Sequence, residues 1–507
     1  MFFRKRPKQT SMVHYETKEK TMHEVFEKAK RSSDFETISP GETNGFLSIS
    51  YYKSLVDMDL FNQLFLTNLK EKLAAVKKLA DLKDITPLDS ILITGDVKEI
   101  QRGLYRGAVV IFLRNNLHEC ALIGIQDPRL GKRETNDTEN EFSVIGPKIG
   151  FIEDLNTNLH LLRSQLVTSD LIFEEIEVGT RSKTKVVVAH LTGVTNPDYV
   201  QTARQRIEDL DVDVLYDNTQ LEELISDHAS TPFPLFITTE RVDRTIFSLI
   251  RGNVVIFTDK SCYALIGPAS LMNFFSTPED FYLPWVVASF FRIIRIVGML
   301  FSIFVTSFYV AILTYHFEIV PKDLLGPIIY SRSNVPFPPV VEVLFLEITI
   351  ELLREAGARL PTKIGQTLGI VGGIVIGQAT VEAALTSNIL LILVALGALS
   401  SFTTPIYKMS NTVRLLRYPF ILLAAIWGGF GLYIGIIFLV AHLLRLKSFG
   451  SPYLLPLSPY RKGGVTNTII RKDFIFHKNR YKSLRTLSRK RYDPAINKDP
   501  EEGLNSE

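Results

Sequence analysis

Two long apolar runs dominate the C-terminal half of the chain. Residues 296–315 and 418–441 contain no charged side chain. Each run is long enough for the hydrocarbon core of a bilayer, which a helix of about 20 residues crosses. Two shorter uncharged runs lie between them, at 364–381 and 389–407. The pattern predicts a membrane α-helical domain over residues 283–459.

The N-terminal half instead alternates short strand-like runs with helical stretches. Residues 46–52 predict a strand that leads into a helix over 57–78. In the same way, 185–191 predict a strand before a helix over 197–210, where Pro197 suits the first helical turn. Such runs favour mixed sheets with helices on one face. The fold class that we expect is therefore α/β plus membrane α-helical.

This half also contains an internal repeat. The sequence Leu-Tyr-Arg-Gly-Ala-Val-Val-Ile-Phe at 104–112 returns as Leu-Ile-Arg-Gly-Asn-Val-Val-Ile-Phe at 249–257. Such self-similarity predicts that Gly107 and Gly252 occupy equivalent positions between a turn and a strand. The repeat divides this half into duplicated α/β subdomains at 36–134 and 160–282. A polar linker at 135–159 joins them, and the charged residues 1–35 are expected to form a flexible N-terminal segment.

The distribution of charge predicts the membrane topology. Arg292 and Arg295 directly precede the first long run, and basic residues dominate 461–491, where Asp473 is the one acid. By the positive-inside rule, the α/β half and the basic tail at 460–507 both face the cytoplasm, which requires an even number of crossings; the uncharged runs supply four. Three basic residues would then lie on the outer side, against this rule: Lys408, Arg414 and Arg417.

Glycines recur every four residues through one of the shorter runs: Gly365, Gly369, Gly373 and Gly377. On a helix they form one groove, into which a helix of the same or another subunit can pack. Gln378 and Glu382 lie one turn apart and away from this groove. A carboxylate at the end of an uncharged segment faces a partner or a water-filled cavity, because exposing its charge to lipid costs several kcal/mol. The segment therefore either packs against helices or lines a conduit with Gln378 and Glu382 at its mouth.

An acidic amphipathic stretch, 340–357, precedes the glycines. Four charged residues share one helical arc: Glu347, Glu351, Arg354 and Glu355. Apolar residues gather opposite, which predicts an interfacial helix. Its charges serve either as the solvated face of a surface helix or as a gating collar over a pore. Glu342 lies off the arc, near the helix start, where the helix dipole favours a carboxylate.

Motifs for catalysis or cofactor binding are lacking. The two cysteines, Cys120 and Cys262, are far apart, so they predict free thiols in a reducing cytosol rather than a disulfide or metal framework. The nine histidines are scattered, and no phosphate loop, dinucleotide fingerprint or helical His-Glu-x-x-His pair occurs. We expect neither an enzyme nor a cofactor or metal. The basic tail has no aromatic platform for nucleic acid, and attraction to anionic lipid explains it more simply.

From about residue 45 to 459, the chain resembles the A subunits of the GerA-type spore germinant receptors. The membrane pattern of that family is matched at 335–339, 351–361, 364–367, 370–373, 376–378 and 448–453. Its soluble pattern is matched at 157–163, 182–184, 232–234, 239–241 and 278–280. Departures at 146–151, 241–243 and 259–260 indicate a divergent paralogue.

The resemblance implies the A subunit of a nutrient-responsive receptor in the spore inner membrane. It implies a transporter-like B subunit that holds the nutrient, a lipoprotein C subunit, and a homo-oligomeric ring of A subunits in membrane lipid that conducts ions when germinant binds. Two other functions stay open. The protein could be a non-conducting scaffold that couples the B subunit to a separate channel, or a related spore-membrane ion channel without its own nutrient receptor.

Overall fold

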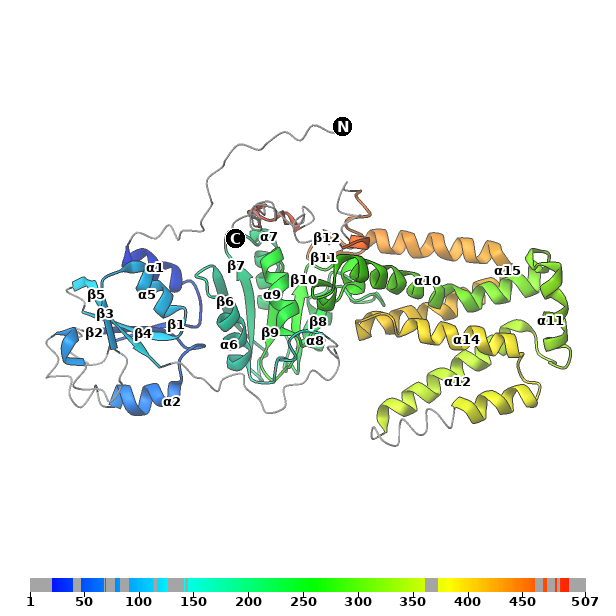
Figure 1. Cartoon of the computed structure of the whole chain (residues 1–507), viewed down its shortest axis with the longest axis horizontal. Coiled ribbons are helices and arrows are strands. Elements are labelled where there is room, and N and C mark those ends of the chain that lie inside the picture. Colours follow the sequence, from blue (N-terminus) through cyan, green and yellow to red (C-terminus); the bar gives the residue numbers. More distant parts are fainter. Residues whose placement is uncertain are drawn as a thin grey trace, which may run out of the picture. The chain divides into compact units, whose positions relative to one another are not determined.

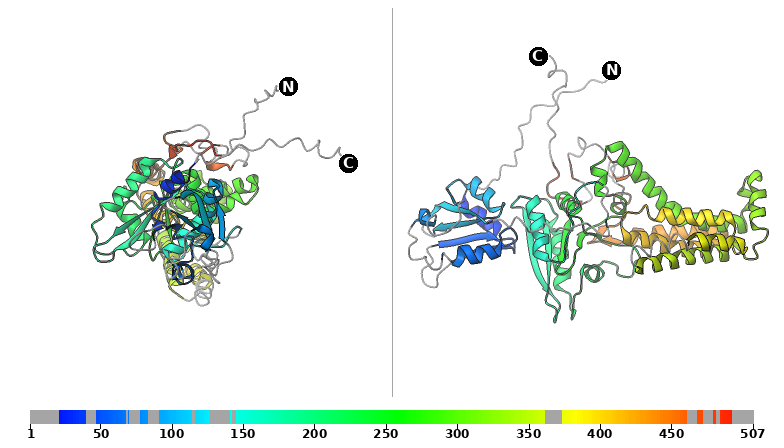
Figure 2. Two further views of the ribbon diagram at one scale, coloured as in Figure 1. Left: turned by 90° about the vertical axis from the view of Figure 1, so that its left-hand side faces the viewer. Right: turned by 60° about the horizontal axis from the view of Figure 1, so that its bottom comes forward.

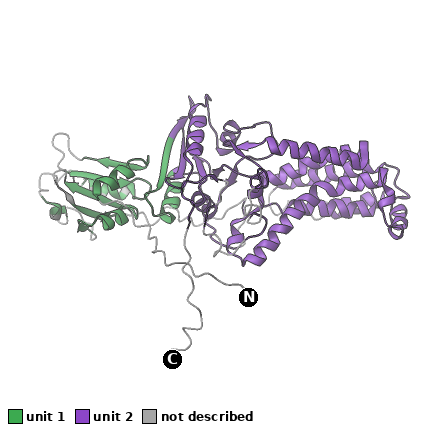
Figure 3. Cartoon of the chain, turned by 90° about the horizontal axis from the view of Figure 1, so that it is seen from above, with its two compact units in different colours: residues 1–133, 156–175 green, residues 134–155, 176–507 purple. Residues whose placement is uncertain are grey.

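The structure is a computed structural model. It describes residues 21–39, 47–67, 69, 78–82, 91–113, 116–125, 141, 145–360, 373–460, 468–471, 479–480 and 484–491. The chain divides into two compact units (Figure 3). Unit 1 comprises Met1–Arg133 and Asn156–Glu175, and unit 2 comprises Glu134–Leu155 and Ile176–Glu507.

Unit 1 contains a five-stranded sheet in the order β1-β2-β4-β5-β3, whose neighbouring strands are all antiparallel. The strands are β1 (Phe35–Ile38), β2 (Leu47–Tyr52), β3 (Ile91–Thr94), β4 (Ala108–Leu113) and β5 (Asn116–Gly124). Successive residues of β4 point to opposite faces: Val109 and Ile111 join one buried cluster, and Val110 joins another. We expected helices on one face only, but helical residues cover both.

The first face is covered by α2 (Met58–Leu60) and the π-helix Phe61–Leu66, whose Phe61 is buried. This segment is the described part of the helix expected over 57–78. The other face is covered by α1 (Met22–Ala29) and α5 (Val97–Leu104).

Helix α1 corrects the expectation that residues 1–35 form a flexible segment. Four apolar residues at helical spacing are buried against the sheet: Met22, Val25, Phe26 and Ala29. Residues 1–35 are so highly charged that this periodicity was not recognised. Taken by itself, the periodicity predicts an amphipathic helix. Residues 1–20 lie outside the described ranges.

The second sheet has the order β6-β7-β9-β10-β8. Its strands are β6 (Leu171–Val178), β7 (Thr184–Leu191), β8 (Ile237–Thr239), β9 (Val254–Thr258) and β10 (Ala264–Gly267). The helices of unit 2 that accompany this sheet are α7 (Pro197–Glu208), α8 (Asn218–Leu224) and α9 (Val242–Arg251), whereas α6 (Leu155–Gln165), which precedes β6, belongs to unit 1 from Asn156 onward. If the strands of each sheet are numbered from one to five along the chain, both sheets have the same spatial order, 1-2-4-5-3.

The repeated glycines lie between a helix and a strand in both sheets. Gly107 separates α5 from β4 with φ 88°, and Gly252 separates α9 from β9 with φ 101°. These angles lie in the left-handed region that glycine adopts without strain. For Gly252 this conformation ends α9.

The rest of unit 2 is largely a bundle of helices, with two short strands after the last of them (Figures 1 and 2). Its helices are α10 (Trp285–Tyr315), a 3-10 turn (Phe317–Ile319), α11 (Lys322–Arg332), α12 (Pro339–Arg359), α14 (Asn388–Ser401) and α15 (Tyr407–Arg445). Among the described residues, α10 and α15 are long and apolar enough to cross a membrane. The predicted run 389–407 is divided, because α14 ends at Ser401 and Tyr407 begins α15. Strands β11 (Lys447–Ser448) and β12 (Ser451–Pro452) follow.

Helix α15 is a hairpin of two helices. Gly428 has the non-helical angles φ 60° and ψ −136°, and the chain reverses there. A Cβ added at Gly435 would lie 2.7 Å from the ring of Phe420, so the two halves pack closely. The run 418–441, which we predicted to be one span, therefore contains a turn. At that turn, Tyr315 of α10 donates its hydroxyl to the carbonyls of Ala425 and Ile426.

Candidate functional site

The strongest candidate site within unit 2 is the joint between the second sheet and the helical bundle. A loop at 231–236 holds both ends of the α15 hairpin. Thr412, near the start of α15, donates its hydroxyl to the carbonyl of Pro232. Near the end of α15, the His442 Nε2 lies 2.9 Å from the Thr231 hydroxyl. A displacement of this loop would therefore act on both halves of α15.

An ion pair joins α8 to α15 beside this loop. Lys408 Nζ contacts the carboxylate of Glu222, which also accepts from the Thr238 hydroxyl at 3.0 Å. Burial raises the pKa of Glu222 more than the charge of Lys408 lowers it. A cavity of about 410 Å³ lies between α8, the 231–235 loop and the start of α15. The ion pair of Glu222 and Lys408 therefore borders a cavity between the sheet and the helical bundle.

The β11-β12 turn is the second connection to the loop. Ser448 donates its hydroxyl to the carbonyl of Leu235 at 2.7 Å, and Tyr453 donates to that of Pro234 at 3.0 Å. The rings of Phe236 and Phe449 pack edge to face, with centroids 4.8 Å apart. Two motifs far apart in sequence, 232–234 and 448–453, thus meet in one contact.

A third connection lies at the start of α10. Asp280, which is fully buried, accepts from Arg292 at 2.8 Å and from Arg295 at 2.8 Å. The two ion pairs attach the start of α10 to Asp280, which follows the second sheet in the chain. The two arginines therefore have a structural role in addition to the one expected from the positive-inside rule. Sequence analysis gave Asp280 no such role, although it lies in a motif that carries the family resemblance.

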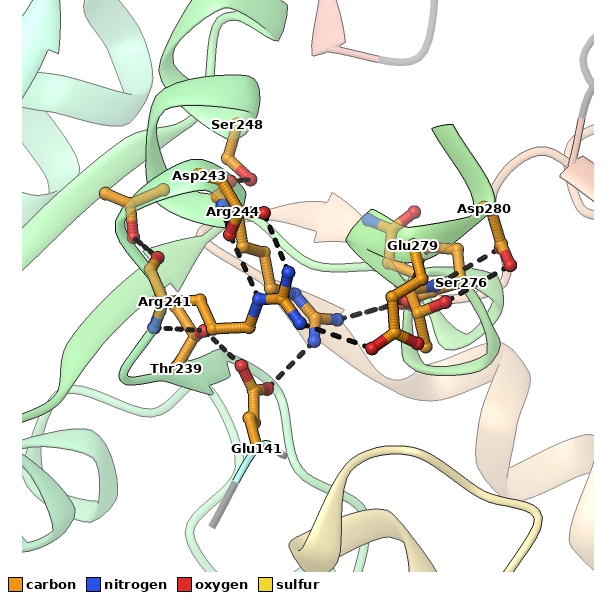
Figure 4. A network of polar contacts seen from close by, with 12 residues as sticks. Glu141, Thr239, Arg241, Asp243, Arg244, Ser248, Ser276, Glu279 and Asp280 are labelled. Atoms are coloured by element: carbon orange, nitrogen blue, oxygen red, sulfur yellow. Dashed lines mark hydrogen bonds and ion pairs between the residues drawn. The ribbon is translucent and has the colours of Figure 1, made fainter. Parts of the chain in front are cut away.

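Further ion pairs continue from Asp280 toward β8 and α9 (Figure 4). Arg241 donates to Asp243 at 2.8 Å, and Arg244 donates to Glu141 at 2.9 Å. Glu141 also accepts from the Thr239 hydroxyl. Burial lowers the pKa of Arg241, but the charge and hydrogen bonds of Asp243 outweigh it and raise that pKa. The network is saturated with internal partners, which suits a rigid support rather than a catalytic site.

Ion pairs also join the helices of the bundle, and the pair of Arg417 is buried. Arg417 of α15 donates to Glu347 of α12 at 3.0 Å, and its guanidinium also reaches the carbonyl of Gly397 on α14 at 2.7 Å. Arg414 pairs with Glu351 at 2.7 Å. Two basic residues that the topology rule left on the wrong side thus have acidic partners on α12.

The other charges predicted on α12 have different surroundings. Arg354 lies over the ring of Phe402, 4.0 Å from its centroid. Glu355 is exposed and pairs with Arg359 one turn later. Glu342 is fully buried and accepts from Arg332 at 2.8 Å. The predicted polar arc therefore faces other helices at Glu347 and Glu351 and is exposed at Glu355.

The structure describes only part of the predicted glycine groove. Gly365 and Gly369 lie outside the described residues. A Cβ at Gly373 would meet no described atom within 4 Å, and one at Gly377 would reach only Leu391, at 3.7 Å. Gln378 and Glu382 are exposed and joined by a 2.8 Å hydrogen bond. The structure does not bring these residues together with the joint at 231–236.

The closest helix contacts of the bundle are made at glycines that sequence analysis did not select. A Cβ at Gly298 of α10 would lie 2.7 Å from Thr403, and one at Gly397 of α14 would lie 3.1 Å from Val305. The signal was present, because Gly431 and Gly435 stand four residues apart in an apolar run. In the ranges that the structure describes, no group of three or more His, Cys, Asp or Glu could hold a metal ion.

The joint at 231–236, the buried ion pairs of Asp280 and the apolar hairpin of α15 are typical of a membrane-associated protein, and the described residues contain no catalytic constellation. A profile of the Bacillus/Clostridium GerA spore germination protein family matches residues 20–483. The chain therefore belongs to the GerA family.

Individual relatives match over most of the chain. Spore germination protein GerQA of Bacillus cereus is 44% identical over 89% of this chain and 90% of its own length. Spore germination protein GerIA of the same species is 46% identical over 89% of this chain and 67% of its own length. The crystal structure of the N-terminal domain of the A subunit of the Bacillus megaterium spore germinant receptor GerK3 covers 49% of this chain and 92% of its own, at 24% identity and TM-score 0.36.

Proposed function

We propose that this protein is the A subunit of a nutrient-responsive spore germination receptor. It transduces germinant binding by a partner B subunit into ion release through an oligomeric channel in the spore inner membrane. Membership of the GerA family supports a role in germination. The observation that carries transduction is the joint at 231–236, which connects an α/β subdomain to both ends of a membrane hairpin.

The proposed path of the signal begins in the α/β part of unit 2. A shift of the 231–236 loop moves the two ends of α15 together, because Thr412 and His442 both bind it. The ion pairs of Arg417 and Arg414 pass this motion to α12. Packed helices with paired charges have discrete arrangements, so such a motion switches the bundle between states.

The hairpin supports a cytoplasmic position for both ends of the membrane domain. The start and the end of α15 bind the same loop, so Lys408 lies on the side of the sheet and the basic tail. In this topology Arg414 and Arg417 enter the bundle from the cytoplasmic side and satisfy the positive-inside rule. The hairpin of α15 supplies two crossings by itself, so its start and its end lie on the same side of the membrane.

Assembly follows from the exposed glycine face. Gly373 meets no described side chain of its own subunit, so a second copy of the chain is its proposed partner in a homo-oligomer. Gln378 and Glu382 would then flank the conduit, and the exposed end of α12 at Glu355 would lie at the membrane surface. The two sheets of equal strand order support a gene duplication. A lipoprotein C subunit completes the proposed receptor.

The decisive experiment is ion flux in liposomes that contain this protein alone or with its B partner. We expect germinant-dependent flux only with the partner. Lys408→Met should lower that flux by about 5-fold or more, the low end of typical coupling energies, because Glu222 loses its partner at the joint. Lys447→Met, which removes an exposed cation nearby, should leave it unchanged. A complex that assembles but never conducts would instead support the non-conducting scaffold.

A further inference from the structure

The basic tail lies against the protein itself. Its described residues, 468–471, 479–480 and 484–491, contact the start of α10, the end of α9 and Val194 in the turn after β7. The backbone and side chains of the tail make these contacts through hydrogen bonds rather than through charge alone. Attraction to anionic lipid, which its composition predicts, therefore does not account for the positions of these residues.

Arg471 is the centre of the first contact. Its side chain is nearly fully buried, and its guanidinium donates to the carbonyls of Phe281 and Leu283. The same guanidinium lies over the Phe281 ring, 5.4 Å from the centroid. Phe281 ends the last 3-10 turn of the α/β part, and Pro284 caps α10. Arg471 thus binds the short connection through which the sheet meets the first long helix.

Helix α10 binds the tail in return. Ser289 donates its hydroxyl to the carbonyl of Arg471 at 3.2 Å, and Arg292 donates to the carbonyl of Thr468 at 3.1 Å. Arg292 also pairs with Asp280 before the connection. The tail therefore contacts both the connection at 281–284 and the start of α10 after it, and Arg292 joins the tail to Asp280 before the connection.

A second contact fixes the tail further along. Arg480 donates through Nε to the carbonyl of Ile250 at 2.7 Å, in the last turn of α9, where cations are favoured. Leu487 donates its N–H to the carbonyl of Val194 at 3.2 Å. A Cβ at Gly252 would lie 2.5 Å from Thr486 Cγ2, so the repeated glycine of α9 also makes room for the tail.

We propose that the described residues of the tail, 468–471, 479–480 and 484–491, form an intramolecular strap that holds α10 in one orientation relative to the second sheet. With the strap docked, Arg471 holds the connection at 281–284 while Ser289 and Arg292 of α10 bind the same tail, so the connection cannot bend freely. With the strap released, the pairs of Asp280 and the hydrogen bond from Arg295 to the Phe275 carbonyl still hold the start of α10. The tail is therefore a conformational restraint on the first membrane helix, whatever signal the protein carries.

Hydrogen exchange of the full-length protein in nanodiscs of neutral phosphatidylcholine tests the strap. Arg471→Ala should raise the exchange rate of amides at 282–290 on the order of 10-fold, because local opening becomes easier. The matched control is Arg489→Ala, which removes an equal charge from an exposed part of the tail. Equal effects of the two variants, or no rise at 282–290 in Arg471→Ala, would overturn the strap.

A second variant and a second lipid composition distinguish the strap from loss of the fold and from binding of the tail to lipid. If Arg471→Ala also raises exchange in β9, the variant has lost its fold. In that case Ser289→Ala, which removes one hydroxyl contact to the tail, is used in place of Arg471→Ala. It should give a smaller rise in the exchange rate, confined to 282–290. In nanodiscs that also contain anionic phosphatidylglycerol, the unmodified protein should keep its slow exchange. Exchange as fast as in Arg471→Ala would show that the tail leaves the protein for lipid and would refute the proposal.

Discussion

Arg417 of α15 donates to Glu347 of α12 across 3.0 Å, and each side chain is 4% exposed. Removing one partner of such a pair leaves the other charge buried without compensation. We expect Glu347→Ala to lower the free energy of unfolding by about 3–5 kcal/mol. Thermal unfolding of the purified protein in detergent would measure this as a lower midpoint.

The exposed pair of Glu355 and Arg359 supplies the control, since Glu355→Ala should cost about 1 kcal/mol or less. The double variant Glu347→Leu with Arg417→Leu should recover most of the lost stability, because no buried charge remains. If Glu347→Ala and Glu355→Ala shifted the midpoint equally, the pair would contribute no more than a surface contact.

Gly373→Leu should weaken assembly while leaving the single chain folded. No described atom lies within 4 Å of the added Cβ, so in the proposed oligomer the leucine would meet a neighbouring subunit. Crosslinked oligomers should become smaller, with an unchanged unfolding midpoint. Gly435→Leu is the contrasting variant, because its Cβ would clash with Phe420 inside α15 and should lower the midpoint itself. Intact oligomers of Gly373→Leu would mean that the groove faces lipid.

Glu382 distinguishes a conduit from a structural contact. Its carboxylate is exposed and accepts from Gln378 at 2.8 Å. If it flanks the ion path, Glu382→Gln should reduce cation preference and Glu382→Lys should reduce it further, since local charge sets the local cation concentration. Reversal potentials at matched subunit abundance measure this preference. The same preference in both variants, with normal current, would place Glu382 outside the path.

Asp34 and Arg163 give unit 1 a pH dependence. Arg163 donates two hydrogen bonds to the Asp34 carboxylate, at 2.6 and 2.7 Å. Burial alone would raise the pKa of Asp34, but Arg163 and two serine hydroxyls hold it below its ordinary value of 3.8. The folded state thus binds this proton more weakly than the unfolded state. The resulting stability is complete well above pH 3.8 and is lost as pH falls through the lower folded pKa.

Asp34→Asn should therefore destabilise unit 1 by about 3–5 kcal/mol near neutral pH. The difference from the unmodified protein should shrink below about pH 3.8. Urea unfolding of the full-length protein in detergent, followed by near-ultraviolet circular dichroism, measures both effects. Glu27→Gln, at an exposed pair with Lys30, should change little. A difference independent of pH would assign the loss to packing rather than to charge.

Local patterns predicted much of the α/β part. The strand at 46–52 and the helix that begins at Pro197 both appear, because alternation and a proline at the first turn are short-range signals. Helix α1 was missed although Met22, Val25, Phe26 and Ala29 are spaced as on one face of a helix, because the charge of the whole segment was given more weight than this periodicity.

Contacts between distant residues were not predictable in the same way. The pairing of Arg417 with Glu347 depends on how two helices cross, which no single helical pattern contains. The turn at Gly428 was hidden because apolar residues continue on both sides of it, so hydropathy alone describes one span. Arg292 showed a related ambiguity: its charge fits the topology rule, while its partner Asp280 depends on the fold.

The hairpin of α15 also has a mechanical consequence. A helical arm of about 20 residues is about 30 Å long, so a rotation of about 5° at its base moves the far end by about 3 Å. Both arms are anchored at the 231–236 loop, and their tip at Gly428 touches Tyr315 of α10. In the proposed mechanism, the hairpin would therefore amplify a small movement at the sheet into a displacement comparable to the width of an atom at the opposite end of α10.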